Sequence, residues 1–252
     1  MSKTFYEAET PEEALEIYFK GYKDLYEKTK EQVIKNVIYS MISSWNSLKV
    51  LEVGAGGGVW TEFFIKNGAA EVTCVDLCKN ILIGNKKLHP EARFILADAT
   101  TLALREKFDF IFAKDVIEHI EKDLRFLLNM NRHLKKDGIL LITSQNLFSL
   151  NYLIEASVNF LRHKKWCGWD PTHIRFYTSN SLNRKLEMAG FRVIKYFGCY
   201  HFPYRLLTRK MFGRLIEKKI FHIIEQSRLC YKFPFNVTGW SIGVVAKKVD
   251  EA

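Results

Sequence analysis

Three side chains able to accept or release protons stand close together in the run DVIEHI, residues 115–120. Asp115, Glu118 and His119 are spaced i, i+3 and i+4, so a helix beginning here would place all three on one face. Another histidine, His173, follows later in the chain. Such groups can take a proton from a substrate or bind a divalent cation. We therefore predict Asp115, His119 and His173 as catalytic residues.

A glycine-rich turn closes an apolar run in the segment LEVGAGGG, residues 51–58. Only glycine allows the backbone to approach a nucleotide-like ligand this closely. A dinucleotide fingerprint, G-x-G-x-x-G, would require a glycine at position 59, which is Val59. The spacing G-x-G-x-G therefore favours S-adenosylmethionine over NAD. The predicted cofactor-binding residues of this turn are Glu52, Gly54, Ala55, Gly56 and Gly58.

Further polar groups follow at the ends of the next expected strands. Asp76 comes 22 residues after Gly54 and can accept hydrogen bonds from both ribose hydroxyls. At the next strand end, the Asp98 carboxylate and the Ala99 backbone N–H are placed for an adenine amino group and ring. The carboxyl ends of parallel strands meet at one edge of a sheet, so these groups should converge. Leu77 and Asp115 complete the predicted cofactor-binding set.

Alternating strand and helix patterns are typical of a doubly wound α/β fold with a mostly parallel sheet. The strands read as continuous apolar runs, as sheets covered on both faces require. We predict seven strands, at 48–53, 71–76, 93–97, 108–114, 138–144, 191–197 and 241–247. We predict helices at 11–44 (broken near Gly21), 60–67, 79–88, 116–135, 147–162 and 178–189.

Length and composition favour one folded domain over residues 1–252, because 48% of the residues are hydrophobic and 14% are aromatic. We divide it into an N-terminal helical cap (1–46), a core (47–200 and 237–249) and a helical insertion before the last strand (201–236). Five scattered cysteines without a C-x-x-C pair favour neither a disulfide framework nor a cysteine zinc site. No signal peptide or membrane span is evident, so we expect a cytoplasmic protein.

The glycine turn with Glu52, Asp76 and Asp98-Ala99 resembles the class I S-adenosylmethionine-dependent methyltransferases, in particular the small-molecule branch of ubiquinone-biosynthesis O-methyltransferases. The likeness extends from about Lys49 to Phe191, plus the final strand. It implies strand order 3-2-1-4-5-7-6 with an antiparallel seventh strand, and O-methylation of a small or lipid-tailed acceptor. The stretch LKKDGILLITSQN departs from the family pattern, because Asp137 stands where the first glycine is usual.

The same resemblance implies that the loop containing His173 lies over the cleft. Asp115, Glu118, His119 and His173 would then resemble the metal site of metal-dependent ubiquinone O-methyltransferases and of methyltransferases that modify small-RNA 3′ ends. Mixed oxygen and nitrogen ligands suit Mg²⁺, Mn²⁺, Fe²⁺ or Zn²⁺. Two alternatives stay open: His119 or His173 acts directly as a general base, or these side chains orient the substrate or fasten the loop without a metal.

Most of the net charge of +10 lies near the C-terminus. Segment 203–232 contains eight basic residues against two acidic ones. Within 204–229, apolar and basic residues recur at helical spacing, which predicts an amphipathic basic helix. Such a helix can serve as a solvated lid, contact an anionic membrane, or face nucleic acid, and we rank the nucleic acid last.

Three other functions stay open as alternatives. One is methylation of RNA, and a second is cofactor binding without catalysis. The third is NAD-dependent oxidoreduction, which Val59 disfavours.

Overall fold

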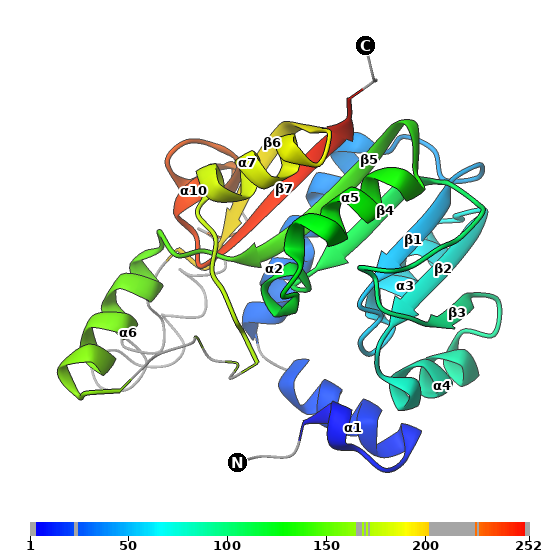
Figure 1. Ribbon diagram of the computed structural model, residues 1–252, viewed down its shortest axis with the longest axis horizontal. Helices are drawn as coiled ribbons and strands as arrows, with labels where there is room; N and C mark the ends of the chain where they lie inside the picture. Colours follow the sequence, from blue (N-terminus) through cyan, green and yellow to red (C-terminus); the bar gives the residue numbers. More distant parts are fainter. Residues whose placement is uncertain are drawn as a thin grey trace.

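The computed structural model describes residues 4–22, 25–164, 168, 170, 172–201, 225 and 227–249. Its centre is one seven-stranded sheet in the order β3-β2-β1-β4-β5-β7-β6 (Figure 1). Strands β1 to β5 are parallel to one another, whereas β7 runs antiparallel to both β5 and β6. Both the doubly wound fold and the predicted strand order are thereby confirmed. The strands are β1 (Lys49–Val53), β2 (Glu71–Asp76), β3 (Arg93–Leu96), β4 (Phe108–Lys114), β5 (Leu134–Gln145), β6 (Phe191–Cys199) and β7 (Ser241–Lys248).

Helices cover both faces of the sheet. On one face, α2 and α3 pack against it through a cluster that includes Ile34, Val37 and Phe64. On the other face, α5 and α7 do so through a cluster that includes Phe126 and Leu186. The α-helices are α1 (Pro11–Tyr22), α2 (Leu25–Met41), α3 (Val59–Lys66), α4 (Lys79–Leu88), α5 (Asp123–His133), α6 (Leu150–Leu161), α7 (Ser179–Met188) and α10 (Phe235–Thr238).

Side chains along β1 point alternately to the two faces of the sheet, so some contact the α2/α3 layer and others the α5/α7 layer. Val50 belongs to the α2/α3 cluster, whereas Leu51 and Val53 belong to the α5/α7 cluster. Because successive side chains point to opposite faces, Glu52 points toward the α2/α3 layer. There its carboxylate accepts a hydrogen bond of 2.6 Å from the hydroxyl of Thr61 in α3. Glu52 is thus a buried group between sheet and helix.

Two predicted elements differ from the structure. The segment expected as one helix over 116–135 is a short 3-10 helix, η2 (Ile117–His119), followed by α5. Asp115 has a φ of 53°, which is outside helical geometry, so the predicted common helical face does not form. Strand β5 begins earlier than predicted, and Asp137 within it has a φ of 61°. Asp137 thus adopts the left-handed conformation that favours glycine and that aspartate tolerates better than most residues.

Most of the predicted basic helix, residues 204–224 and 226, lies outside the described residues. After it, the chain forms η3 (Arg228–Tyr231) and α10. Glu225 is fully buried and accepts hydrogen bonds from the backbone N–H groups of Tyr200 (2.9 Å) and His201 (2.8 Å), at the other end of the insertion. The two ends of the insertion are therefore joined at the sheet.

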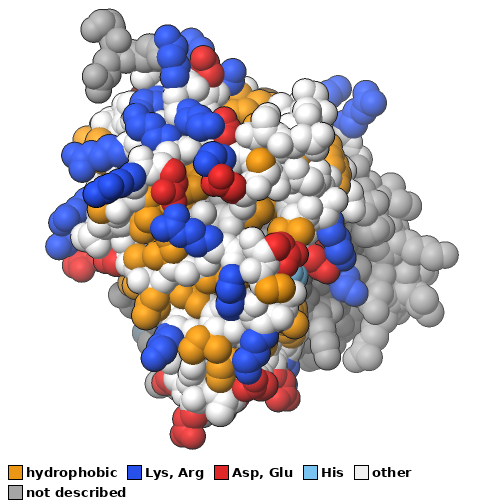
Figure 2. Space-filling model, turned by 90° about the vertical axis from the view of Figure 1, so that its right-hand side faces the viewer, with side chains coloured by type: hydrophobic (Ala, Val, Ile, Leu, Met, Phe, Trp, Pro, Cys, Tyr) orange, Lys and Arg blue, Asp and Glu red, His pale blue; other side chains and the backbone are white. Residues whose placement is uncertain are grey.

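The face that carries β3 and α4 mixes its charges. In Figure 2, the Lys and Arg side chains of the described residues lie among Asp, Glu and hydrophobic groups. None of the described helices combines the length and the apolar character needed to cross a bilayer.

Candidate active site

A cavity of about 560 Å³ lies at the carboxyl ends of the central strands. Its wall combines strand ends, the glycine turn, the N-terminal segment and the loop after α6. Predicted site residues that line it are Gly54, Gly56, Asp76, Leu77, Asp98, Ala99, Asp115, His119 and His173. Glu52, Ala55, Gly58 and Glu118 are not among the lining residues. Glu52 points toward α3 instead, because successive side chains of β1 point to opposite faces of the sheet, and its carboxylate accepts a hydrogen bond from Thr61.

The glycine turn has the backbone conformation that its sequence predicts. Gly54, Gly56 and Gly58 all have positive φ, at 79°, 48° and 78°. A Cβ atom on Gly54 would come within 2.6 Å of the Val116 side chain, and one on Gly57 within 2.5 Å of the Tyr18 ring. The turn therefore requires glycine both for its conformation and for the close approach of neighbouring side chains.

Asp76 is held in place by backbone donors. Its Oδ1 accepts from the N–H of Cys78 at 2.8 Å, and its Oδ2 accepts from the N–H of Gly56 at 3.4 Å. Burial raises the pKa of this carboxyl group, and the backbone donors oppose that rise. A carboxylate oriented in this way at the glycine turn can accept hydrogen bonds from ribose hydroxyl groups. Asp98 lies on the same cavity wall, and its Oδ1 accepts from the N–H of Thr100 at 2.7 Å.

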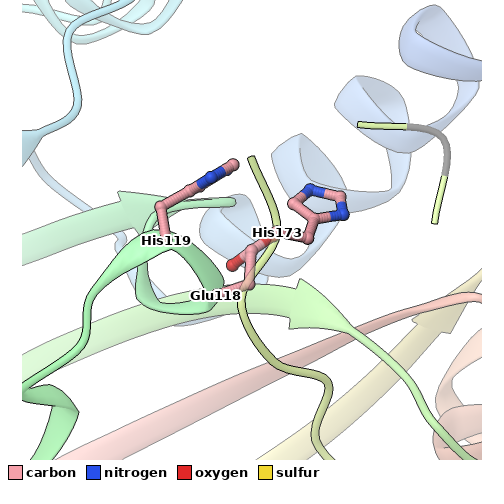
Figure 3. A group of neighbouring side chains, drawn as sticks. All are labelled: Glu118, His119 and His173. Carbon is pink, nitrogen blue, oxygen red and sulfur yellow. The ribbon is translucent and has the colours of Figure 1, made fainter. Parts of the chain in front are cut away.

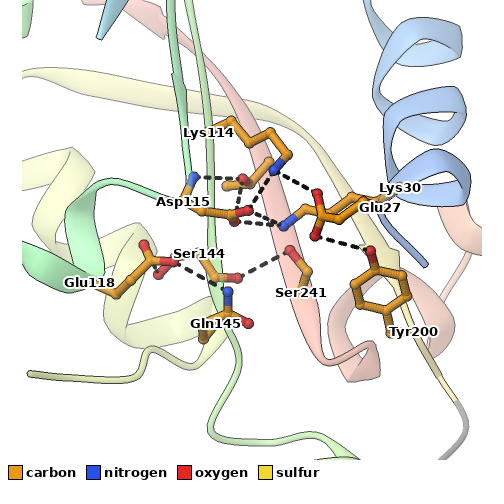
Figure 4. Close-up of polar contacts among 10 residues, drawn as sticks. Glu27, Lys30, Lys114, Asp115, Glu118, Ser144, Gln145, Tyr200 and Ser241 are labelled. Carbon is orange, nitrogen blue, oxygen red and sulfur yellow. Dashed lines mark hydrogen bonds and ion pairs between the residues drawn. The ribbon is translucent and has the colours of Figure 1, made fainter. Parts of the chain in front are cut away.

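Asp115 takes part in a network of charged groups that connects β4 to α2 (Figure 4). Its two oxygens lie 2.6 Å from Nζ of Lys30, and its Oδ2 lies 3.0 Å from Nζ of Lys114. Lys114 also donates to Glu27 at 2.9 Å, and Glu27 accepts from the Tyr200 hydroxyl at 3.4 Å. Burial alone would raise the pKa of Asp115, but Lys114 and Lys30 hold it well below the usual range.

Glu118, His119 and His173 come together, with potential ligand atoms all within 4.8 Å of one another. Figure 3 shows Glu118 and His119 on η2 and His173 on a separate segment that runs past it. Asp115, predicted as a fourth member, does not join them, because Lys30, Lys114 and Thr143 engage its carboxylate. The structure therefore unites three of the four predicted metal ligands.

Hydrogen bonds determine which nitrogen of His119 carries a proton. The hydroxyl of Thr172 donates to Asp170 Oδ1 at 2.6 Å, since a carboxylate can only accept. Burial opposes ionisation of Asp170, but the hydrogen bonds from Thr172 hold its pKa below the usual value. Nδ1 of His119, 3.0 Å from the same hydroxyl oxygen, is therefore the donor. In the neutral imidazole, the lone pair is then on Nε2.

Glu118 differs from Asp115 in its surroundings. It is fully buried, and it accepts hydrogen bonds from Ser144 (3.0 Å) and Gln145 (3.3 Å). Burial, together with the negative charge of Asp115, raises the pKa of Glu118 to about 8. Two imidazoles and one carboxylate form a donor set suited to Fe²⁺, Mn²⁺ or Zn²⁺. The hydrogen bond from Nδ1 of His119 is the outer contact that metal-binding histidines commonly make, so the residues fit a cation.

The sequence analysis did not predict several residues that line the cavity: Tyr18, Glu27, Lys30, Lys114 and Tyr200. Lys114 could have been found, because it ends a predicted strand next to Asp115. Lys30 could not, because a lysine on an N-terminal helix is usually solvated, yet its side chain is only 1% exposed.

A family model described as a methyltransferase domain matches residues 18–196. The chain therefore belongs to the methyltransferase domain family. The predicted resemblance to class I S-adenosylmethionine-dependent methyltransferases is confirmed by this match, and S-adenosylmethionine is accordingly the cofactor.

Two curated relatives are named ubiquinone biosynthesis O-methyltransferase. The one from Pelagibacter ubique is 31% identical over 121 residues, which cover 46% of this chain and 50% of that protein. The one from Rickettsia canadensis is 26% identical over 152 residues, which cover 58% and 62%. The chain spans about half of the first relative's length and less than two thirds of the second's.

Among solved structures, the N-methyltransferase NodS from Bradyrhizobium japonicum, in complex with S-adenosyl-L-homocysteine, aligns with a TM-score of 0.57. It is 13% identical, and the alignment covers 90% of each chain. At this identity the likeness concerns the fold alone.

Proposed function

We propose that the chain transfers a methyl group from S-adenosylmethionine to an oxygen atom of a small-molecule or lipid-tailed acceptor. One observation carries this proposal: a single cavity has Asp76 and Asp98 at its wall together with His119 and His173. A nucleoside held by the two aspartates would leave its sulfonium methyl facing the remaining space of the cavity. The O-methyltransferase names of the curated relatives support oxygen as the accepting atom.

The transfer is an in-line displacement at carbon. The acceptor oxygen forms a bond to the methyl carbon while the sulfur–carbon bond breaks, and its electron pair stays on sulfur to give S-adenosylhomocysteine. Much of the rate enhancement of such a reaction comes from holding the two reactants in line. The acceptor hydroxyl also loses a proton. Where no cation occupies the lone pair on Nε2 of His119, that nitrogen can accept the proton, because Nδ1 already donates to Thr172.

A divalent cation is part of the proposal. Glu118, His119 and His173 would hold it, with donor atoms within 4.8 Å of one another. When bound, such a cation would lower the pKa of an acceptor hydroxyl. The charge pair of Lys30 with Asp115 keeps that aspartate away from the cation and fixes the end of β4 beside the glycine turn.

The test is calorimetric titration with S-adenosylhomocysteine, followed by methyl-transfer assays with added Mn²⁺ or Zn²⁺. The acceptor panel contains catechols with and without an isoprenoid tail, and a short single-stranded RNA. We expect binding of the nucleoside and methylation of a catechol oxygen. No nucleoside binding, or methylation of the RNA alone, would reject the proposal.

Histidine variants test the cation site. His119→Ala with His173→Ala should abolish transfer and metal uptake, whereas His163→Gln, an exposed histidine after α6, should preserve both. If metal uptake persists in the double variant, the cation site is wrong while methyl transfer stands.

A further inference from the structure

The cavity has two ends, and the nucleoside needs only one of them. Asp76 at the end of β2 and Asp98 after β3 line the first end. Gln145 at the end of β5 and Asn151 in the first turn of α6 line the other. Because β1 and β4 lie between β2 and β5, a spacing of about 4.8 Å per strand places the two ends roughly 14 Å apart. The end at Gln145, which we call the acceptor end, is therefore left for the methyl acceptor.

The side-chain amide of Gln145 is buried with its oxygen unpaired. The residue is 7% exposed, and its Nε2 donates to a carboxylate oxygen of Glu118 at 3.3 Å. In Figure 4 the amide nitrogen points toward Glu118 and the amide oxygen points away from it. Among the described residues this oxygen, Oε1 of Gln145, has no hydrogen-bond partner. Because Gln145 lines the cavity and Glu118 does not, we place this oxygen on the cavity side of the amide.

Asn151 has the same arrangement on a different element. It is 2% exposed, and its Nδ2 donates to the backbone carbonyl of Tyr200 at 2.7 Å. A carbonyl oxygen can only accept, so the amide nitrogen of Asn151 is held there and its Oδ1 is the end left over. Two buried amides at the acceptor end thus have their nitrogens engaged by the protein and their oxygens available to a ligand.

The chemistry of the acceptor end favours a neutral proton donor. A buried oxygen without a hydrogen bond is unfavourable in the free protein, and a ligand hydroxyl that donates to it removes this cost. The charged groups next to Tyr200 balance, since Lys30 and Lys114 pair with Glu27 and Asp115. No surplus negative charge is present among these groups to stabilise a buried ammonium, so a hydroxyl fits better.

We propose that Gln145 and Asn151 determine acceptor specificity by accepting a hydrogen bond from a second hydroxyl of the acceptor, one that is not methylated. A site built to bind a hydroxyl in this way rejects analogues that lack it. The two amides take no proton and hold no cation. The assignment of their ligand as a methyl acceptor rests on the proposed function, whereas the subsite itself can be tested by binding alone.

The test is calorimetric titration of the complex with S-adenosylhomocysteine, in the presence of EDTA, with catechol, 2-methoxyphenol and phenol. EDTA removes any divalent cation, so a preference for two hydroxyls cannot come from two bonds to a metal. We expect catechol to bind roughly tenfold more tightly than the other two, as one additional hydrogen bond to a neutral group predicts. Equal affinities of the three ligands would overturn the proposal.

Variants assign the preference to the two amides. Gln145→Met keeps the length of the side chain without the amide, and Asn151→Leu does the same at the second position. Each should lower the preference for catechol toward unity and leave the affinity for S-adenosylhomocysteine unchanged, which also shows that the variant is folded. Where one variant does not fold, the other decides.

The matched control is Gln32→Met, because Gln32 is an exposed glutamine on α2. It should prefer catechol as the parent chain does. A preference that persists in the folded amide variants, or one that Gln32→Met loses equally, would overturn the proposal.

Methyl-transfer assays with added Mn²⁺ or Zn²⁺ separate this proposal from the proposed function. Preferential binding of catechol, lost in the amide variants, without methyl transfer to any acceptor would leave the subsite in place and reject the function. Methylation of phenol and catechol with equal kcat/KM, together with equal binding, would leave the function in place and reject the subsite.

Discussion

At the scale of single residues, burial alone does not determine the charge of a carboxylate. Glu52 and Asp115 both lie at ends of central strands, but their surroundings differ. Glu52 meets a hydroxyl and a thiol, and burial raises its pKa to about 8. Asp115 meets two ammonium groups, Lys114 and Lys30, which lower its pKa despite burial. Asp115 is therefore a fixed negative charge, and Glu52 is neutral at mildly acidic pH.

The buried Glu52 predicts a pH dependence of stability. Its folded pKa lies above its unfolded value of 4.5, so the native state binds the proton more tightly. The free energy of unfolding should fall as the pH rises from about 4.5 to about 8, by at most about 1.4 kcal/mol per pH unit from this group. Urea denaturation of Glu52→Gln across this range should show a flatter profile. Glu71→Gln, at the exposed start of β2, should leave the slope unchanged.

Substitution of Asp76 should lower the affinity for the cofactor directly. Asp76→Ala removes the carboxylate that Gly56 and Cys78 orient toward the cavity. Hydrogen bonds to a charged group contribute about 1.5–3 kcal/mol, so the dissociation constant for S-adenosylhomocysteine should rise by roughly ten- to a hundredfold. Calorimetric titration measures it. An unchanged dissociation constant would show that the ribose does not bind at the end of β2.

At the scale of elements, caps and turns determine where the cavity-forming segments begin. Tyr177 lies just before Thr178, the N-cap of α7. Its hydroxyl donates to Asp123 at 2.7 Å and so connects the loop of His173 to α5. Thr178 caps α7 by accepting from the N–H of Ser181 at 3.1 Å, and the hydroxyl of Ser181 accepts in return from the N–H of Thr178 at 2.8 Å. This reciprocal capping box fixes the position at which the His173 loop ends.

Loss of this cap should be measurable. Thr178→Ala removes one half of the capping box, and such changes typically cost about 1 kcal/mol. Thermal or urea denaturation should show that loss, whereas Asn180→Ala, exposed in the first turn of the same helix, should have little effect. Equal losses in both variants would assign the effect to helix propensity and not to the cap.

At the scale of the whole molecule, a buried ion pair joins the ends of the insertion between β6 and β7. Nδ1 of His201 lies 3.0 Å from Glu225 Oε1, and Nε2 donates to the Phe235 carbonyl at 2.7 Å. Burial opposes both charges. The hydrogen bond and charge of each partner nevertheless raise the pKa of His201 and lower that of Glu225. Tyr200 beside this pair lines the cavity, so the pair also positions part of the site.

Removing one partner should destabilise the protein strongly. His201→Ala leaves Glu225 buried without its counter-charge, and breaking such pairs typically costs about 3–5 kcal/mol. The stabilisation due to His201 is fully present below its unfolded pKa and is lost as the pH rises through its raised folded pKa. Denaturation of the parent chain and of His201→Ala at pH 6 and pH 9 should therefore differ more at pH 6. A pH-independent difference would mean that the pair is not charged.

The sequence by itself determined the layered fold, the strand order implied by the resemblance, and the glycine turn. These depend on local patterns: apolar runs specify buried strands, and positive φ at Gly54, Gly56 and Gly58 requires glycine. Asp76 and Asp98 could also be found, because strand ends meet at one edge of a parallel sheet.

Only the tertiary structure decided how the charged groups pair. Lys30 and Asp115 lie 85 positions apart, and the periodicity of a helix does not specify which strand end its lysine meets. The same holds for His173, which a separate loop brings to Glu118 and His119. The exposed side of α6 also has a pattern that fits a buried helix, and only its packing shows which side chains face solvent. Such contacts depend on how whole elements dock, which a single sequence does not encode at any one position.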